Sequence, residues 1–333
     1  MVSIDYIREV LDNKDKNFIE NLAKKSRNLT LKHFGNTISL YAPLYLSNYC
    51  DNQCTYCGFN HSRDIERTKL TEQEMEKEMQ RLASYGIQNV LLLTGESKKH
   101  SPPEYIETAV IIAKKYFSTI NLEVFPMEVE DYKMLYEAGA DGVTVYQETY
   151  DRQRYRELHI KGPKSNYAFR YLTPERIAKA GMRSISMGIL LGLSEIDKDI
   201  LSLFNHLEQM EKDFPGVEYS LSFPRIIPIK NYKSDLYIAD DVTLIKLICL
   251  ARILFPTVGI NLSTREDGVL RDNALRLGIT RISAASKTTV GGYSDTKNDT
   301  PQFDVMDHRS VEEIKNMIKV KGFDPVFTDW RRI

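Results

Sequence analysis

Three of the chain's four cysteines, Cys50, Cys54 and Cys57, lie within a stretch of eight residues. Thiolates bind soft metals, and three of them in one loop are more typical of a metal site than of a packed core. An iron–sulfur cluster held by three cysteines leaves one iron with an open position, where a small molecule can bind and be reduced. The spacing therefore predicts a catalytic iron–sulfur site.

A structural zinc site is the alternative for the same cysteines. Zinc in such sites takes four ligands, commonly from paired Cys-x-x-Cys or Cys/His motifs, and the sequence has no second pair. His61 could supply a fourth ligand, but a lone histidine in this polar stretch is expected to be exposed. Cys249 falls in an apolar helical stretch and is expected to be a buried core residue.

The composition excludes several classes of partner. The chain has 333 residues with 45 Lys and Arg against 46 Asp and Glu, and its formal net charge of −1 supplies no field for nucleic acid or an anionic membrane surface. No apolar run approaches the roughly 18 residues that span a bilayer, and the first residues lack a signal-peptide pattern. We therefore expect a cytoplasmic protein that binds neither nucleic acid nor membrane.

The elements that could position these cysteines alternate from about residue 38 onward. Short apolar, β-branched runs predict strands, and the segments of helical period between them predict helices. The expected strands are residues 38–47, 88–93, 120–125, 142–146, 184–190, 218–223, 257–262 and 280–284. The expected helices are 71–85, 102–117, 129–138, 173–181, 196–213, 240–254 and 266–277. Thr71 and Glu74 form a capping box that marks the start of the first helix.

Eight strands alternating with helices predict an α/β fold, a closed (β/α)8 TIM-type barrel. Polar or glycine residues follow nearly every expected strand, and barrel active sites are built from the loops at these strand ends. An open doubly wound sheet is the alternative, with its chemistry at one switch point. We place the barrel at residues 36–286, a helical N-terminal extension at 1–35, and a C-terminal extension with a helix near 310–320 at 287–333.

The spacing Cys-x-x-x-Cys-x-x-Cys, with the aromatic Tyr56 directly before the last cysteine, resembles the signature of radical S-adenosylmethionine (SAM) enzymes. The wider sequence is similar to the tyrosine lyase branch of that superfamily. The similar blocks are residues 43–50, 57–60, 92–96, 145–150, 222–225, 262–266 and 291–293. The resemblance covers nearly the whole chain from about residue 35 onward.

Two families of this branch share these blocks: the 2-iminoacetate synthases of thiazole and thiamine biosynthesis, and the hydrogenase maturases that form carbon monoxide and cyanide from tyrosine. The maturases carry a C-terminal extension with further cysteines for a second cluster, whereas this chain has no cysteine after Cys249. Its tail at residues 325–330 is similar to that of the thiazole enzymes. These features favour the 2-iminoacetate synthases.

The resemblance implies a radical SAM carbon–carbon lyase. Such an enzyme cleaves the Cα–Cβ bond of L-tyrosine to 2-iminoacetate (dehydroglycine) and p-cresol, with 5′-deoxyadenosine and methionine as co-products. A maturase-like tyrosine lyase and a deazaflavin-forming radical SAM enzyme are the alternatives within the superfamily. A non-catalytic barrel that binds zinc through its cysteines is the alternative from another class.

The resemblance also implies two cofactors, a [4Fe-4S] cluster bound by the three cysteines and SAM on its open iron. The residues expected to contact SAM are Tyr56, Thr94, Gly95, Glu96, Glu148, Arg170, Gly192 and Leu193. In related enzymes residues 94–96 meet the amino group, Glu148 the ribose hydroxyls, Arg170 the carboxylate and residues 192–193 the adenine.

Each SAM contact has a plainer alternative. Residues 94–96 could form an ordinary turn between a strand and a helix. Glu148 could form a surface ion pair with Arg152 or Arg154, and Arg170 could be a solvated arginine.

The carboxylate of a bound tyrosine needs a fixed cation. Arg265, with Ser263 beside it after the seventh strand, matches the substrate arginine of the related lyases. Arg225 after the sixth strand is the second candidate, for which a salt bridge at the barrel rim is the alternative. No residue can be named for the phenol. The resemblance further implies a reductant such as flavodoxin or ferredoxin and leaves open a direct complex with a thiazole synthase partner.

Overall fold

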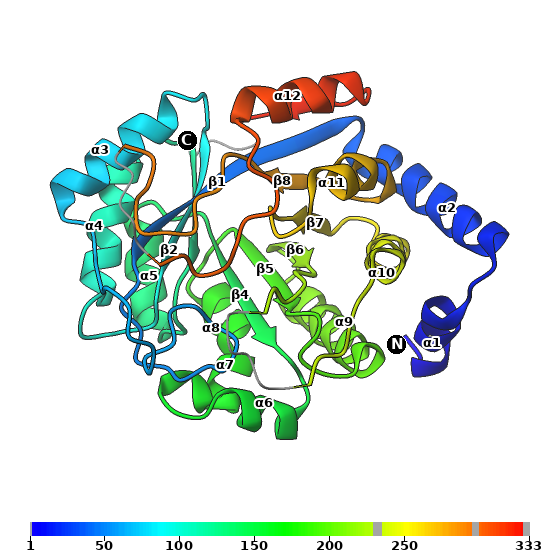
Figure 1. The fold of residues 1–333 in the computed structure, drawn as a ribbon, viewed down its shortest axis with the longest axis horizontal. Coiled ribbons are helices and arrows are strands. Elements are labelled where there is room, and N and C mark those ends of the chain that lie inside the picture. The colour runs from blue at the N-terminus through cyan, green and yellow to red at the C-terminus, as the bar shows by residue number, and fades with distance from the viewer. Residues whose placement is uncertain (1, 229–234, 295–299, 329–333) are drawn as a thin grey trace.

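The computed structural model describes residues 2–228, 235–294 and 300–328, and eight parallel strands close into a barrel at its centre (Figure 1). Asp329 and Trp330 of the tail lie outside the described residues. The barrel strands are β1 Thr37–Ser47, β2 Asn89–Thr94, β3 Thr119–Glu123, β4 Gly142–Glu148, β5 Ser184–Ile189, β6 Glu218–Ser222, β7 Gly259–Leu262 and β8 Arg281–Ser283.

The sheet closes because β1 pairs with both β2 and β8. The predicted (β/α)8 barrel is thereby confirmed, and each expected strand is present. A short further strand, β9 (Asp324–Val326), pairs with the start of β1 and was not predicted. The predicted division at residues 35/36 and 286/287 stays a prediction.

Helices surround the barrel (Figure 1). They are α1 Ile4–Asp12, α2 Lys16–Phe34, α3 Glu72–Ala83, α4 Pro103–Ala113, α5 Val129–Ala138, α6 Arg152–Leu158, α7 Tyr167–Tyr171, α8 Thr173–Lys179, α9 Ile196–Asp213, α10 Asp241–Leu254, α11 Gly268–Ala274 and α12 Val311–Val320. The expected capping box begins α3, since Thr71 accepts from the backbone N–H of Glu74 and the Glu74 carboxylate accepts from that of Thr71. The sequence did not predict α6 and α7.

Side chains of β1 alternate between the two sides of the sheet, as the period of two requires. Ile38, Leu40 and Leu44 have no exposed surface and belong to the main apolar core beneath the helices. Tyr41 and Tyr45 instead line a cavity inside the barrel. One strand therefore supports both the core and the site.

The inside of the barrel nearer the N-terminal ends of the strands is lined with polar side chains, where branched apolar residues usually dominate. Asn121 Nδ2 donates to Asn89 Oδ1 at 3.1 Å, and Asn261 Nδ2 donates to Ser186 Oγ at 3.0 Å. The first hydrogen bond joins the neighbouring strands β2 and β3, and the second joins β7 to β5 inside the barrel.

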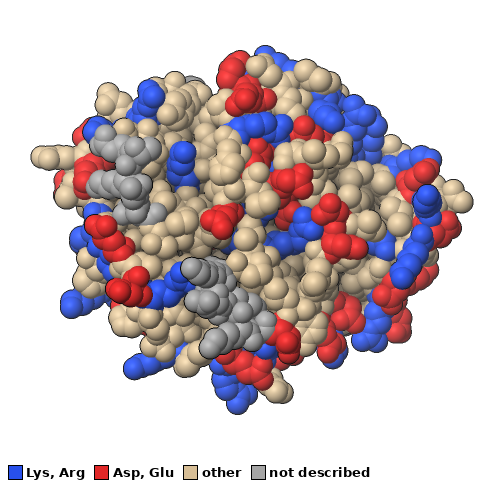
Figure 2. Space-filling view, viewed as in Figure 1, with Lys and Arg blue, Asp and Glu red and all other residues tan. Residues whose placement is uncertain are grey.

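The surface mixes both charge signs. Figure 2 shows basic and acidic side chains interspersed over this face, as the net charge of −1 leads one to expect. Within the described residues, no helix combines the length and apolar character needed to cross a membrane.

A buried ion pair ties the segment after β8 to the barrel. Arg271 on α11 pairs with Asp307 and also donates to the carbonyl of Ser283, and both charged side chains are almost fully buried. Arg309 bridges the same Asp307 to Asp272 at 2.8 Å. Burying charges is unfavourable unless they are paired and hydrogen-bonded, and this network meets that condition.

We predict that Asp307→Ala lowers the free energy of unfolding by about 3–5 kcal/mol, because it leaves the buried guanidinium of Arg271 without its partner. Urea denaturation followed by circular dichroism measures this change. The matched control is Asp304→Ala, which removes an exposed carboxylate from the same segment. Equal denaturation curves for the two variants would contradict the anchoring role.

Candidate active site

The three cysteines lie in the loop that follows β1 at the C-terminal end of the barrel. Cys54 is buried, while Cys50 and Cys57 are half-buried, and all are free thiols. Arg67 holds this loop closed, because its guanidinium donates to the carbonyls of Asn48, Phe59 and Asn60 at 2.7–2.9 Å. One side chain thus ties the start of the cysteine loop to its end.

A second segment, residues 158–164 from the last residue of α6 onward, clamps the loop from the other side. The backbone N–H of Gln53 donates to the carbonyl of Lys161 at 2.8 Å, and that of Thr55 donates to the carbonyl of Leu158. Burial lowers the pKa of His159 to about 3, so its ring is neutral. Its Nδ1 donates to the carbonyl of Tyr155 and its Nε2 accepts from the hydroxyl of Tyr56 at 2.8 Å.

The chemistry of the three thiols fits an iron–sulfur cluster. Burial raises the pKa of each thiol, and neighbouring thiols add to the increase for Cys50 and Cys54. Bound iron supplies the positive charge that keeps such thiols ionised. The described residues contain no group of three Cys, His, Asp or Glu arranged around a single metal ion.

His61 and Cys249 lie as expected. His61 is exposed and its Nδ1 contacts the carbonyl of Cys50 at 3.1 Å. Cys249 has no exposed surface and belongs to the main core.

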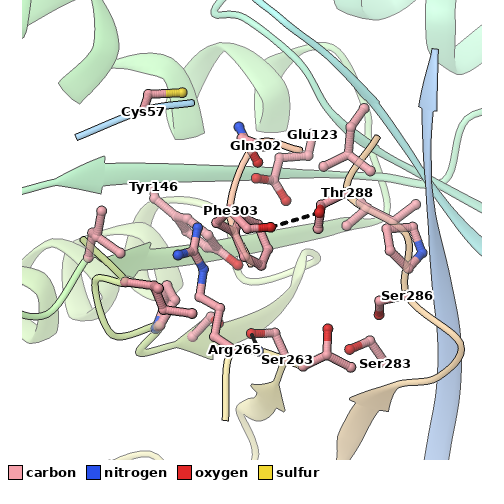
Figure 3. A pocket seen from close by; sticks show the side chains of 18 of the residues that line it. Cys57, Glu123, Tyr146, Ser263, Arg265, Ser283, Ser286, Thr288, Gln302 and Phe303 are labelled. Atoms are coloured by element: carbon pink, nitrogen blue, oxygen red, sulfur yellow. Dashed lines mark hydrogen bonds between the residues drawn. The ribbon is translucent and has the colours of Figure 1, made fainter. Parts of the chain in front are cut away.

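A cavity opens beside the cysteine loop and is lined by residues from strands all around the barrel. Figure 3 shows Cys57 at one side of it and Arg265, Glu123 and Tyr146 pointing into it. The predicted site residues that line this cavity are Tyr56, Cys57, Glu148, Ser263 and Arg265. The other predicted residues, except Arg225, contact the cysteine loop or the residues that line the cavity.

Residues 94–96 at the end of β2 lie directly against the cysteine loop. The backbone N–H of Asp51 donates to the carbonyl of Glu96, and Glu96 Oε2 accepts from Asn52 Nδ2 at 2.7 Å. At Gly95, an added Cβ would lie 2.3 Å from the carbonyl oxygen of Tyr49. Thr94 Oγ1 is buried without a partner among the described residues, which fits a site for a polar ligand.

Glu148 is turned into the cavity by an irregularity at the end of β4. The register with β5 shifts between Tyr146 and Glu148, and Glu148 has a φ of 71°, a conformation uncommon outside glycine. Its carboxylate lies 2.6 Å from Lys164 Nζ and 3.4 Å from Arg170 Nη2. Burial raises the pKa of Glu148, but the two cations outweigh it and lower the pKa overall. The expected alternative, a surface ion pair with Arg152 or Arg154, is therefore wrong.

Arg170 and residues 192–193 support this wall of the cavity. Arg170 Nε donates to the carbonyl of Tyr146 at 2.7 Å, and no described residue accepts a hydrogen bond from its Nη1. Gly192 has a φ of 110°, and an added Cβ there would lie 2.4 Å from Ile226 Cγ2. Leu193 is fully buried and packs in one apolar cluster with Cys54 and Tyr56.

Arg265 presents a cation to the cavity, and no carboxylate of the described residues forms an ion pair with it. Its guanidinium lies 3.5 Å above the ring centroid of Phe303, and no described acceptor is hydrogen-bonded to it. Burial lowers its pKa, yet the group stays charged at any physiological pH. Ser263 Oγ accepts from the backbone N–H of Arg265 at 3.3 Å and fixes the turn after β7.

The structure corrects the placement of Arg225, which does not line the cavity. Its guanidinium forms an ion pair with Glu266 and a second one with Asp241 at 2.8 Å. The carboxylate of Glu266 is only 2% exposed, so it needs a cation beside it. The salt-bridge alternative is therefore the correct interpretation of Arg225.

Sequence reasoning missed three contributions to the cavity. Glu123 ends β3, and burial together with the negative charge of Glu148 raises its pKa to about 7. Lys164 stands in the clamp segment, where no motif signals it. Gln302 and Phe303 enter from the segment after β8, and Gln302 accepts from the hydroxyl of Tyr45 at 2.7 Å. A polar residue at a strand end was the available signal for Glu123.

Two hydroxyls of the cavity wall, those of Ser283 and Ser286, are buried near the end of β8, and both residues line the cavity (Figure 3). Ser283 Oγ interacts with the hydroxyl of Tyr41, whereas Ser286 Oγ has no partner among the described residues. A buried hydroxyl without a partner costs free energy. We therefore expect a water molecule or a polar group of a ligand to form a hydrogen bond here.

Comparison with known families agrees with this site. The sequence model of the radical SAM superfamily matches residues 44–207, and that of the biotin and thiamin synthesis associated domain matches residues 222–324. The chain is 37% identical over 330 residues to the 2-iminoacetate synthase of Salmonella typhimurium and 38% identical over 314 residues to that of Escherichia coli. These alignments cover 99% and 94% of this chain, and 88% and 83% of the relatives. The chain belongs to the 2-iminoacetate synthase family.

Solved structures of other enzymes have a similar fold. The hydrogenase maturase HydG from Carboxydothermus hydrogenoformans superposes with a TM-score of 0.91 at 32% identity, covering 98% of this chain and 76% of that chain. Methylornithine synthase superposes with a TM-score of 0.79 at 22% identity and shares the fold. Family membership implies the [4Fe-4S] cluster and SAM that the resemblance predicted.

We predict that Gly95→Ala lowers the amount of iron retained after anaerobic reconstitution. The added Cβ meets backbone atoms of Tyr49, so the cysteine loop itself must shift. Gly216→Ala is the matched control, because no atom lies within 4 Å of the Cβ it would add. Iron analysis that finds the same content in both variants would contradict this close packing of the loop.

Proposed function

We propose that this chain cleaves the Cα–Cβ bond of L-tyrosine to 2-iminoacetate and p-cresol. One observation carries the proposal: the three-cysteine loop and the unpaired cation of Arg265 face the same cavity. A metal site alone would not need a buried guanidinium opposite it. An amino acid substrate does need one for its carboxylate.

Cys50, Cys54 and Cys57 would hold the [4Fe-4S] cluster, and SAM would bind next to it. When bound, these cofactors supply a 5′-deoxyadenosyl radical that removes hydrogen from tyrosine, and methionine and 5′-deoxyadenosine remain as co-products. The protein supplies position, charge complementarity and a wall that excludes water.

The side of the cavity formed by the C-terminal ends of β2, β4 and β5 offers the groups that SAM requires. Residues 94–96 present backbone acceptors for its ammonium, and the carboxylate of Glu148 can accept hydrogen bonds from a ribose diol. Nη1 of Arg170 would donate to the SAM carboxylate, while its Nε donates to the carbonyl of Tyr146 and its Nη2 to the carboxylate of Glu148. Tyr56, fixed by His159, forms the surface next to Cys57.

The cavity also offers both charges that a zwitterionic amino acid needs, Glu123 from the end of β3 and Arg265 from the turn after β7. Arg265 would bind the tyrosine carboxylate, and Glu123 would accept hydrogen bonds from its ammonium. Since both charges of tyrosine sit on its Cα, they would fix the bond to be cleaved. The Ser286 hydroxyl, which has no partner among the described residues, could bind the phenol.

Partners follow from the same chemistry. A one-electron donor such as flavodoxin or ferredoxin would reduce the cluster, and a thiazole synthase would take up 2-iminoacetate, which hydrolyses readily as an imine. The reducing cytoplasm suits a protein whose four cysteines are free thiols. A maturase-like lyase is the second candidate, because HydG shares the fold at 32% identity.

Product analysis tests the function directly. We expect anaerobic protein with SAM, dithionite and tyrosine to form p-cresol, 5′-deoxyadenosine and glyoxylate from the hydrolysed imine. Cyanide or carbon monoxide would identify the maturase-like reaction instead. Cys54→Ala should abolish all products, because the cluster loses a ligand.

We predict that Arg265→Ala weakens tyrosine binding roughly 10- to 100-fold, the range for a lost hydrogen bond between charged groups. The iron content should stay at the wild-type level, since Arg265 does not hold the cysteine loop. Arg27→Ala is the control, because it removes an exposed arginine on α2. Unchanged tyrosine affinity in Arg265→Ala would remove this residue from the site.

The Glu123 carboxyl predicts a pH dependence of tyrosine binding. Its pKa is raised to about 7, so below that pH it is protonated and cannot pair with an ammonium. The KM for tyrosine should therefore rise roughly tenfold between about pH 8 and about pH 6. In Glu123→Gln the KM should be high throughout and lose this dependence. A wild-type profile with no change near pH 7 would refute the role of Glu123.

A further inference from the structure

Lys164 connects the cysteine loop to the cavity and belongs to no sequence motif of the site. Its backbone N–H donates to Asn52 Oδ1 in the cysteine loop at 2.8 Å. Its side chain is only 13% exposed, and Nζ lies 2.6 Å from Glu148 Oε1. Lys164 is also the cation that lies 5.7 Å from the ring centroid of Tyr56, the residue before Cys57.

This geometry places a positive charge beside the thiols and shields it from water. Lys164 and Cys57 line the same cavity. A charge in such a site acts over a low effective dielectric and is little screened by salt. Its position is fixed from two sides, by the backbone hydrogen bond to Asn52 and by the ion pair with Glu148.

We propose that the ammonium of Lys164 stabilises the reduced state of the cluster and thereby raises its reduction potential. A cluster on three thiolates is negatively charged overall. One-electron reduction by the external reductant makes it more negative. A fixed cation nearby favours the more negative state. This inference rests on the proposed cluster and adds a residue that sets its potential.

Redox titration followed by electron paramagnetic resonance tests the proposal on the reconstituted full chain without SAM or tyrosine. We expect Lys164→Met to shift the midpoint potential to a more negative value, while Lys164→Arg keeps it near that of the wild type. Lys161→Met is the matched control, since its side chain is exposed in the same segment. An unchanged midpoint in Lys164→Met with normal iron content would overturn the proposal.

The partner of Lys164 provides an independent test with the opposite sign. Glu148→Gln removes a negative charge at the same position, so the midpoint should become more positive. The double variant Glu148→Gln with Lys164→Met restores the local charge sum and should return the midpoint toward the wild-type value. If Lys164→Met fails to hold iron, an unchanged midpoint in Glu148→Gln overturns the proposal.

The outcome separates this inference from the proposed function. A wild-type chain that binds no iron would refute the cluster and, with it, the function. A wild-type chain that binds the cluster and forms p-cresol, with equal midpoints in all charge variants, would refute only the role of Lys164.

Discussion

The pairing of β1 with both β2 and β8 is the constraint on which the site depends. It closes the sheet, so the C-terminal ends of all eight strands surround one cavity. Because β1 ends at Ser47, the cysteine loop begins at the rim of that cavity. Arg67 then folds the loop back on itself through three backbone carbonyls. Closure therefore brings the cysteine loop after β1, Glu148 at the end of β4 and Arg265 after β7 to one cavity.

The cavity brings several charged side chains together in a buried site. Glu148 lies between Lys164 and Arg170, and Arg265 lies over the ring of Phe303. Each arrangement offsets part of the free energy that burial of a charge costs. Glu123 is the exception, because burial and the negative charge of Glu148 raise its pKa and the cations nearby offset this only in part. Such uncompensated groups are typical of ligand sites and agree with a small zwitterionic substrate.

Much of the fold could be predicted from the sequence because strands and helices alternate with clear periods. The cysteine loop, Glu148 and Arg265 could be predicted because each follows a strand or belongs to a motif. Lys164 could not, since its segment has no regular period and its importance comes from contacts with Asn52 and Glu148. Arg225 was assigned wrongly because the buried Glu266 that binds it is near only in the folded chain.

The central claim is that one cavity holds a three-cysteine cluster and a tyrosine whose carboxylate binds Arg265. A crystal structure of the anaerobically reconstituted protein with SAM and tyrosine measures this directly. We expect Cys50, Cys54 and Cys57 each on a different iron of one cluster, with the tyrosine carboxylate against the Arg265 guanidinium. A single zinc ion on the cysteines, or tyrosine bound away from Arg265, would contradict it.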